Sequence, residues 1–194
     1  MSARERILAR VHDALAERPR VPHPGRFHGE RPGAPPADLV AGFTRMFEQA
    51  GGEVVRVADH AAARAWLATL AEGARGVCVG ATVPATLLPD VTTAPPHAAE
   101  LGVSLAIGAV TETGSLILDA RDGRLTQLLP PTHAVLVRAE TFHATLVDAL
   151  GRLRRDLPSA LGLHSGPSKS ADIGQVLVKG VHGPGRVFAV IIGG

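Results

Sequence analysis

After residue 37 the chain alternates short apolar runs, each long enough for one strand, with segments whose apolar residues recur at helical spacing. Several runs are apolar at every position, as in Val187–Ile192. A strand that is apolar on both of its faces must be covered on both sides, usually by helices. The alternation therefore predicts an α/β fold in which both faces of the sheet are covered.

The same pattern gives the boundaries of the expected elements. In the helix that includes Trp66, Leu67 and Leu70, these three residues are expected to form the buried face. The expected helices are 59–71, 142–155, 171–178 and one that begins after Asp38 and ends at Gly51-Gly52. The expected strands are 53–57, 76–80, 103–107, 115–119, 133–138 and 187–192.

The first 37 residues differ from the rest in composition. Residues 4–17 carry apolar residues at helical spacing, and Ser2 is placed to cap that helix. Residues 18–37 contain six prolines and three glycines, which exclude regular structure. We interpret residues 1–37 as an N-terminal helix with a Pro/Arg-rich arm and residues 38–194 as one α/β domain. The arm either lies as a strap over the domain or docks to a partner.

Composition excludes several classes of protein. The one cysteine, Cys78, cannot form an intramolecular disulfide or hold an iron–sulfur cluster. The nine histidines are scattered without a His-x3-His pair, so we expect no bound metal. The basic residues form no stripe and only 3% of residues are aromatic, which argues against nucleic-acid binding. No apolar run approaches the ~20 residues of a membrane span, and the start lacks the apolar segment of a signal peptide, so we expect a cytoplasmic protein.

Three turns are candidates for chemistry, because ligands of α/β sheets gather at the carboxyl ends of strands. The first, 108–115, places Glu112 among Thr113, Gly114 and Ser115 between two apolar strands. A carboxylate held there could act as a nucleophile or base. The alternative is that the threonines satisfy the amides of the turn and Glu112 is only solvated.

The second turn, 165–172, contains Gly166, Ser168, Lys169 and Ser170 and leads into the expected helix 171–178. Hydroxyls, a lysine and the free N–H groups of a helix N-terminus would attract an anion. Plain N-capping by Ser168 or Ser170 is the alternative.

The third turn, 180–185, bends sharply at its glycines, among them Gly183, and could point His182 into a cleft. His182 could be an acid/base or ligand-binding group, or a histidine bonded only within its own turn. The same two alternatives apply to His133, which follows Pro130-Pro131-Thr132.

Four segments together resemble the LUD domain of the LutC/YkgG type of lactate utilization proteins. They are T-E-T-G-S-L-I-L at 111–118, L-L-P-P-T-H at 128–133, S-G-P-S-K-S-A-D-I at 165–173 and V-H-G-P at 181–184, and the match is closest over about residues 75–192. The resemblance implies a Rossmann-like, mostly parallel sheet of the NagB/RpiA/CoA-transferase kind, with helices on both faces. It also implies a three-protein system that oxidises L-lactate to pyruvate, in which LutA-type and LutB-type partners carry the iron–sulfur clusters and this chain carries none.

The resemblance puts all three turns in recurrent motifs, and we expect them to converge on one cleft that binds a small anion. The candidate catalytic residues are Glu112 and His182. The candidate ligand-binding residues are Thr113, Gly114, Ser115, Gly166, Ser168, Lys169, Ser170 and Gly183.

Two functions fit these observations. The first is a cluster-free accessory subunit of the lactate-oxidising system. The second is a stand-alone CoA-transferase-like or sugar-phosphate-isomerase-like enzyme that uses Glu112, by analogy at the level of the fold. A regulatory module that binds a small molecule is a third, less specific interpretation.

Overall fold

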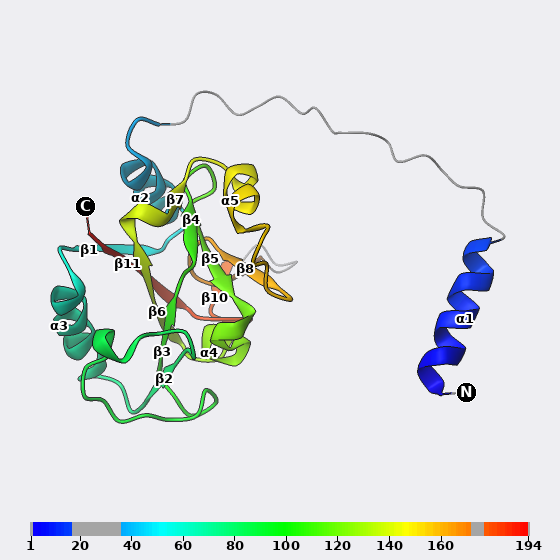
Figure 1. Cartoon of the computed structure of the whole chain (residues 1–194). Coiled ribbons are helices and arrows are strands. Elements are labelled where there is room, and N and C mark those ends of the chain that lie inside the picture. Colours follow the sequence, from blue (N-terminus) through cyan, green and yellow to red (C-terminus); the bar gives the residue numbers. More distant parts are fainter. Residues whose placement is uncertain (1, 17–35, 172–176, 194) are drawn as a thin grey trace. The chain divides into compact units, whose positions relative to one another are not determined.

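The computed structural model describes residues 2–16, 36–171 and 177–193, which belong to two units, Met1–Gly33 and Ala34–Gly194. The first unit contains helix α1, Ala3–Ala16 (Figure 1). Ser2 caps this helix as expected: its Oγ accepts a hydrogen bond from the N–H of Glu5 at 3.2 Å, and the Glu5 carboxylate accepts one from the N–H of Ser2. This reciprocal pair satisfies two N–H groups that the helix itself leaves free.

The second unit is built on a central sheet of five strands in the order β1-β11-β6-β3-β2, in which every pairing is parallel. Its strands are β1 (Glu53–Val57), β11 (Arg186–Ile192), β6 (Thr132–Arg138), β3 (Leu101–Leu105) and β2 (Val77–Val79). The mostly parallel α/β fold expected from the sequence is therefore confirmed.

Both faces of the central sheet are buried. On one face, Ala63 and Leu67 of helix α3 (His60–Ala71) pack in a core with Val190 of β11. Trp66 and Leu70, expected on the buried face of α3, are half-buried against the same core. On the other face, helix α2 (Leu39–Gln49) contributes Phe43 and Phe47, which are fully buried in a second core. Successive residues of β6 and β11 enter the two cores in turn, which is why residues 134–137 and 187–192 are apolar at every position.

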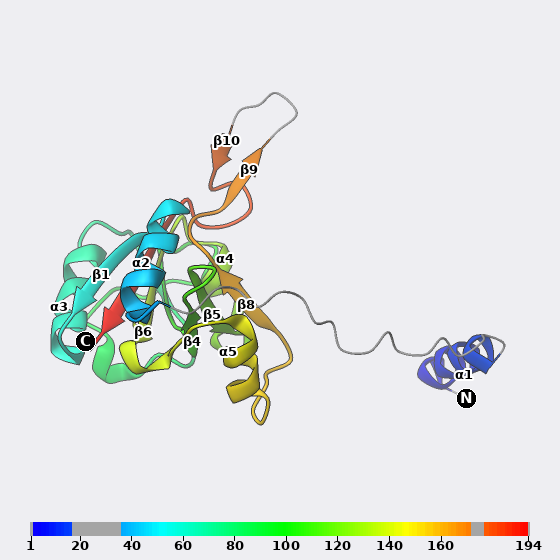
Figure 2. The ribbon, with the colours of Figure 1, turned by 90° about the horizontal axis from the view of Figure 1, so that it is seen from above.

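A smaller sheet of four strands, in the order β7-β4-β5-β8, contributes Phe142, Ala109 and Leu116 to the second core. Helix α5 (Leu146–Leu153) packs on this sheet through Ala149, in a third cluster with Ile117. Figures 1 and 2 both show α3 at one side of the two sheets and α5 at the other. The strands are β4 (Gly108–Val110), β5 (Ser115–Asp119), β7 (Phe142–His143) and β8 (Leu161–His164).

Short segments connect the two sheets. The 3-10 helix η2 (Ala120–Asp122) and helix α4 (Arg124–Leu128) join β5 to β6, and η3 (Ala139–Thr141) joins β6 to β7. Another 3-10 helix, η1 (Ala85–Leu87), lies between β2 and β3.

Two of the expected helices differ from the structure. The segment expected at 142–155 begins as β7, and α5 starts only after Thr145, whose side chain caps it by accepting from the N–H of Asp148.

The helix expected at 171–178 is wrong. Lys169–Ala171 forms strand β9 and Leu177–Lys179 forms strand β10, which pair antiparallel with Ser170 opposite Val178 (Figure 2). The cross-strand bonds give the backbone groups of these residues the partners that a helix would otherwise supply. Residues 172–176 lie outside the described part.

Candidate functional site

Glu112 lies in the turn that joins β4 to β5, and its carboxylate is hydrogen-bonded to the start of helix α5. Oε1 accepts a hydrogen bond from the backbone N–H of Leu146 at 2.7 Å, and the N–H of Glu112 donates to the carbonyl of Ala144 at 3.1 Å. Leu146 is the first residue of α5, where N–H groups lack helical partners and the dipole favours negative charge. In this structure Glu112 therefore caps a helix across the turn.

A chain of hydroxyl groups joins this turn to the second candidate turn. Ser115 Oγ lies 2.7 Å from Thr113 Oγ1 and 2.6 Å from Ser165 Oγ. Ser115 is buried, while Thr113 and Ser165 are exposed, so the chain of hydroxyl groups reaches the surface at both of its ends. Gly114 has φ of 58° and packs against α2, where an added Cβ would come within 2.7 Å of the backbone nitrogen of Phe47. The close approach of the turn to α2 thus requires glycine.

Backbone hydrogen bonds join the second and third turns. The N–H of Ser168 donates to the carbonyl of Pro184 at 2.8 Å, and the N–H of Gly180 donates to the carbonyl of Ser168 at 2.9 Å. His182 contacts Ser168 through its backbone, since its N–H donates to Ser168 Oγ at 3.3 Å, and it is exposed. Gly183 also lies against the Ser168 side chain.

The third turn lies at the other end of the strands of the central sheet from the one expected. The N–H groups of Gly185 and Arg186 donate to the carbonyl of Pro131, at 3.0 and 3.2 Å, immediately before β6 begins. The third turn precedes β11, and parallel strands begin at the same edge of a sheet. The turn 180–185 therefore lies at the amino ends of β6 and β11, not at their carboxyl ends.

Lys169 has a different partner from the one that an anion site would give it. Its Nζ donates to the carbonyl of Ala50, the C-cap residue of α2. A cation is favourable at a helix C-terminus because the last carbonyls carry partial negative charge. Ser170 lies in β9 instead of at a helix start, so the helix dipole that was expected to attract an anion there is missing. Gly166, with φ of 107°, lies beside the same Ala50 carbonyl.

The structure thus connects the three turns, but the candidate residues do not all present side chains to one space. Thr113, Ser115 and Ser165 form one hydroxyl chain, and Ser168 joins the turn of His182. The Glu112 carboxylate instead binds the start of α5. What the arrangement offers chemically is a set of hydroxyl donors and acceptors.

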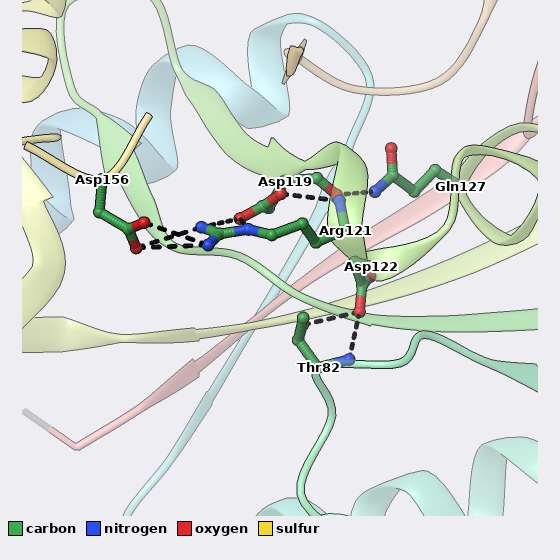
Figure 3. Close-up of polar contacts among 6 residues, drawn as sticks. All are labelled: Thr82, Asp119, Arg121, Asp122, Gln127 and Asp156. Carbon is green, nitrogen blue, oxygen red and sulfur yellow. Dashed lines mark hydrogen bonds and ion pairs between the residues drawn. The ribbon is translucent and has the colours of Figure 1, made fainter. Parts of the chain in front are cut away.

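A group of acidic residues at the carboxyl end of β5 was not among the candidates expected from the sequence (Figure 3). The Asp119 side chain is buried and accepts bonds from the backbone N–H of Arg121 at 2.7 Å and from its Nε at 2.6 Å. Burial raises the pKa of Asp119, but the hydrogen bonds and charge of Arg121 outweigh that effect and hold it below its usual value. Arg121 also contacts Asp156 at 3.2 Å. The signal in the sequence was a pair of aspartates, Asp119 at the end of a buried strand and Asp122 three residues later.

Asp122, from the same segment, fixes the loop after β2. Its Oδ1 accepts bonds from the N–H and Oγ1 of Thr82 at 3.1 and 2.7 Å, while Oδ2 is buried without a partner among the described residues (Figure 3). A Cβ at Gly80 would overlap this carboxylate. The loop 80–82 at the carboxyl end of β2 is therefore shaped by Asp122.

His133 lies inside the protein, not at a turn surface. Its Nε2 is 2.9 Å from Ser104 Oγ, and its Nδ1 has no partner among the described residues. The ring centroids of His133 and His164 are 6.1 Å apart. Burial, with a smaller contribution from the charge of His164, lowers the pKa of His133 to about 3, so its imidazole is neutral near pH 7. Burial also lowers the pKa of His164.

Two features are absent from the part of the chain that the structure describes. None of its helices is long and apolar enough to cross a membrane. Its His, Cys, Asp and Glu side chains form no group of three or more that could hold a metal ion.

Three comparisons relate the chain to known proteins. Residues 97–192 match the family model of the LUD domain. The chain is 35% identical over 103 residues to lactate utilization protein C 1 of Bacillus mycoides and 36% identical over 102 residues to lactate utilization protein C of an Exiguobacterium species. These alignments cover 49% and 48% of this chain but only 44% of each relative, so the matched region spans less than half of the relatives' length.

A crystal structure of a DUF162 family protein from Deinococcus radiodurans has the same fold, with a TM-score of 0.62 and 23% sequence identity. The match covers 81% of this chain and 98% of that one. The residues that match the family model include all three candidate turns. Residues 97–192 of this chain therefore belong to the LUD domain family.

Proposed function

We propose that this chain is a LutC-type subunit of a system that oxidises L-lactate to pyruvate, and that it carries no cluster itself. LutA-type and LutB-type partners would hold the iron–sulfur clusters. The observation that carries the proposal is the LUD-domain match over residues 97–192, together with relatives whose name is lactate utilization protein C.

The surroundings of the single cysteine are consistent with a chain that holds no iron–sulfur cluster. Cys78 is buried in β2. Burial raises the pKa of its thiol, and a hydrogen bond with Thr126 offsets this only in part. A protonated, buried thiol is a poor metal ligand and a poor nucleophile.

Glu112 separates this proposal from the alternative of a stand-alone enzyme. In Glu112→Gln, the amide oxygen can still accept the bond from Leu146, while the charge is removed. If Glu112 only caps α5, we expect the free energy of unfolding of the variant to be about 0.5 kcal/mol lower than that of the wild type. The variant should then support lactate oxidation as well as the wild type. If Glu112 is a nucleophile or base, the same variant keeps its fold and loses activity.

Deletion of the gene, followed by complementation, tests the proposal. We expect the deletion strain to grow on pyruvate but not on L-lactate, and the intact gene to restore growth on lactate. A tagged copy is expected to co-purify with two Cys-rich proteins that show iron–sulfur absorbance, while the chain alone is colourless. Normal growth of the deletion strain on lactate would contradict the proposal.

A further inference from the structure

A hollow of about 350 Å³ lies between helix α4 and strand β8, apart from the three candidate turns. Arg124, Gln127 and Leu128 line it from the helix side, and Leu161, Leu163 and His164 line it from the strand. This volume is at the lower end of the range for small-molecule sites.

The hollow carries one positive charge, on Arg124, that is unpaired among the described residues. Arg124 is exposed, and no ion pair joins it to a carboxylate in the described part of the chain. None of the described residues that line the hollow is acidic. The nearby Asp119 is already paired with Arg121. A guanidinium without a protein partner is well suited to a ligand carboxylate, which it can bind through two hydrogen bonds.

Two further polar groups face the same space. The amide nitrogen of Gln127 donates to the carbonyl of Asp119 at 2.9 Å, and Figure 3 shows its oxygen turned away from that bond. His164 is largely buried, with the fully buried His133 behind it, and its imidazole is neutral near pH 7 because burial lowers its pKa. A neutral imidazole has one donor and one acceptor, which suits a hydroxyl or keto oxygen.

The remaining wall is apolar. Leu128 and Leu163 remain 39% and 47% exposed, and Leu161 is half-buried. Leucines at the edge of a hollow favour a ligand with a short hydrocarbon part, since contact with it removes apolar surface from water.

We propose that this hollow binds a small organic monocarboxylate that carries an oxygen on carbon 2, with its carboxylate on Arg124 and its carbon-2 oxygen near His164 and Gln127. The choice of 2-hydroxy and 2-oxo acids within the monocarboxylates rests on the proposed function in lactate oxidation. The cation, the hollow and its apolar wall are independent of that function.

Titration of the purified full chain with sodium pyruvate and sodium L-lactate tests the proposal by calorimetry and ligand-observed NMR. We expect saturable binding of at least one acid and at least about tenfold weaker binding by Arg124→Gln, because a charge-assisted contact is lost. Arg64→Gln is the matched control, since Arg64 is an exposed residue of α3 outside the hollow, and it should bind like the wild type.

Ala160→Phe provides a second variant that keeps the charge. Ala160 is exposed and lines the hollow, so a phenyl group there should obstruct binding without a change at Arg124.

The proposal is wrong if the wild type binds neither acid saturably, if both variants bind like the wild type, or if sulfate displaces the acids at equal concentration. If the purified chain binds neither acid but the intact gene restores growth of the deletion strain on lactate, this site is rejected and the proposed function stands. If the chain binds an acid specifically but the gene does not restore growth, the proposed function is rejected and the site stands.

Discussion

Two buried side chains, Asp122 and His133, each leave one polar atom without a partner among the described residues. Such an atom destabilises the folded state by about 1–3 kcal/mol, because it loses its hydrogen bonds to water. In both cases the other polar atom of the side chain is bonded, Asp122 to Thr82 and His133 to Ser104. Each residue therefore orients a neighbouring segment at a cost in stability, and each cost is open to measurement.

His133 should make stability depend on acidity. Its pKa is about 3 in the folded protein against 6.5 ordinarily, so the unfolded chain binds a proton that the folded chain does not. The contribution of the neutral imidazole to the free energy of unfolding is complete above about pH 6.5. It is lost as the pH falls toward 3, by up to about 1.4 kcal/mol per pH unit. We expect the unfolding free energy, measured in urea at about pH 7.5 and about pH 5, to fall less for His133→Gln than for the wild type.

His97→Gln is the control for that experiment, because His97 is exposed. It should retain the full pH dependence of the wild type. Identical slopes for the wild type and His133→Gln would contradict the burial of a neutral imidazole.

Gly80 should not tolerate a methyl group. In Gly80→Ala the new Cβ overlaps the buried Asp122 carboxylate, and we expect a loss of about 1–3 kcal/mol in urea unfolding. Gly151→Ala is the matched control: nothing lies within 4 Å of its added Cβ, and it should stabilise α5 by up to about 1 kcal/mol. The loss should be partly recovered in Gly80→Ala combined with Asp122→Ala. Equal effects of the two alanine substitutions would show that Asp122 does not constrain the loop.

At the scale of elements, the C-terminus of α2 depends on a lysine from a distant strand. Lys169→Met keeps the apolar stem and removes the charge at the Ala50 carbonyl, so we expect a loss of about 0.5 kcal/mol that diminishes at high salt. Lys179, directly opposite Lys169 in the hairpin, is the control. Lys179→Met should not destabilise the protein, because it removes a like charge from that position. The prediction fails if both variants lose the same stability.

Strands with a clear apolar run could be predicted from the sequence. The strands expected at 53–57 and 115–119 agree with β1 and β5, and the three-residue β2 lies within the strand expected at 76–80. The strands β4, β7 and β8 have two to four residues each, too few for a periodic pattern. The sequence pattern favours a helix at 171–178, but cross-strand pairing decides the structure of the described residues 169–171 and 177–179.

The candidate site was predictable only in part for a similar reason. Residue types identified the turns around Glu112 and Ser168. Which atoms meet depends on tertiary structure: Ser115 and Ser165 are 50 positions apart, and Glu112 reaches Leu146 across 34. The burial of His133 likewise follows from the place of β6 between β11 and β3.

At the scale of the molecule, β6 and β11 have cores on both faces and a strand on each side. Local opening is rarest where most contacts must break together. We expect amide hydrogen exchange, followed by mass spectrometry, to be slowest in β6 and β11 and much faster in the exposed pair Lys179 and Val178 of β10. Comparable exchange in β10 and β11 would contradict this order.

The place of β11 also has a consequence for biosynthesis. This strand lies between β1 and β6, yet it follows every other strand in chain order. A nascent polypeptide on the ribosome has β1 and the β2–β3–β6 part of the sheet as separate halves until residues 186–192 leave the exit tunnel. Until then the apolar flanks of both halves are available to chaperones, and the domain closes in one late step after translation of its last strand.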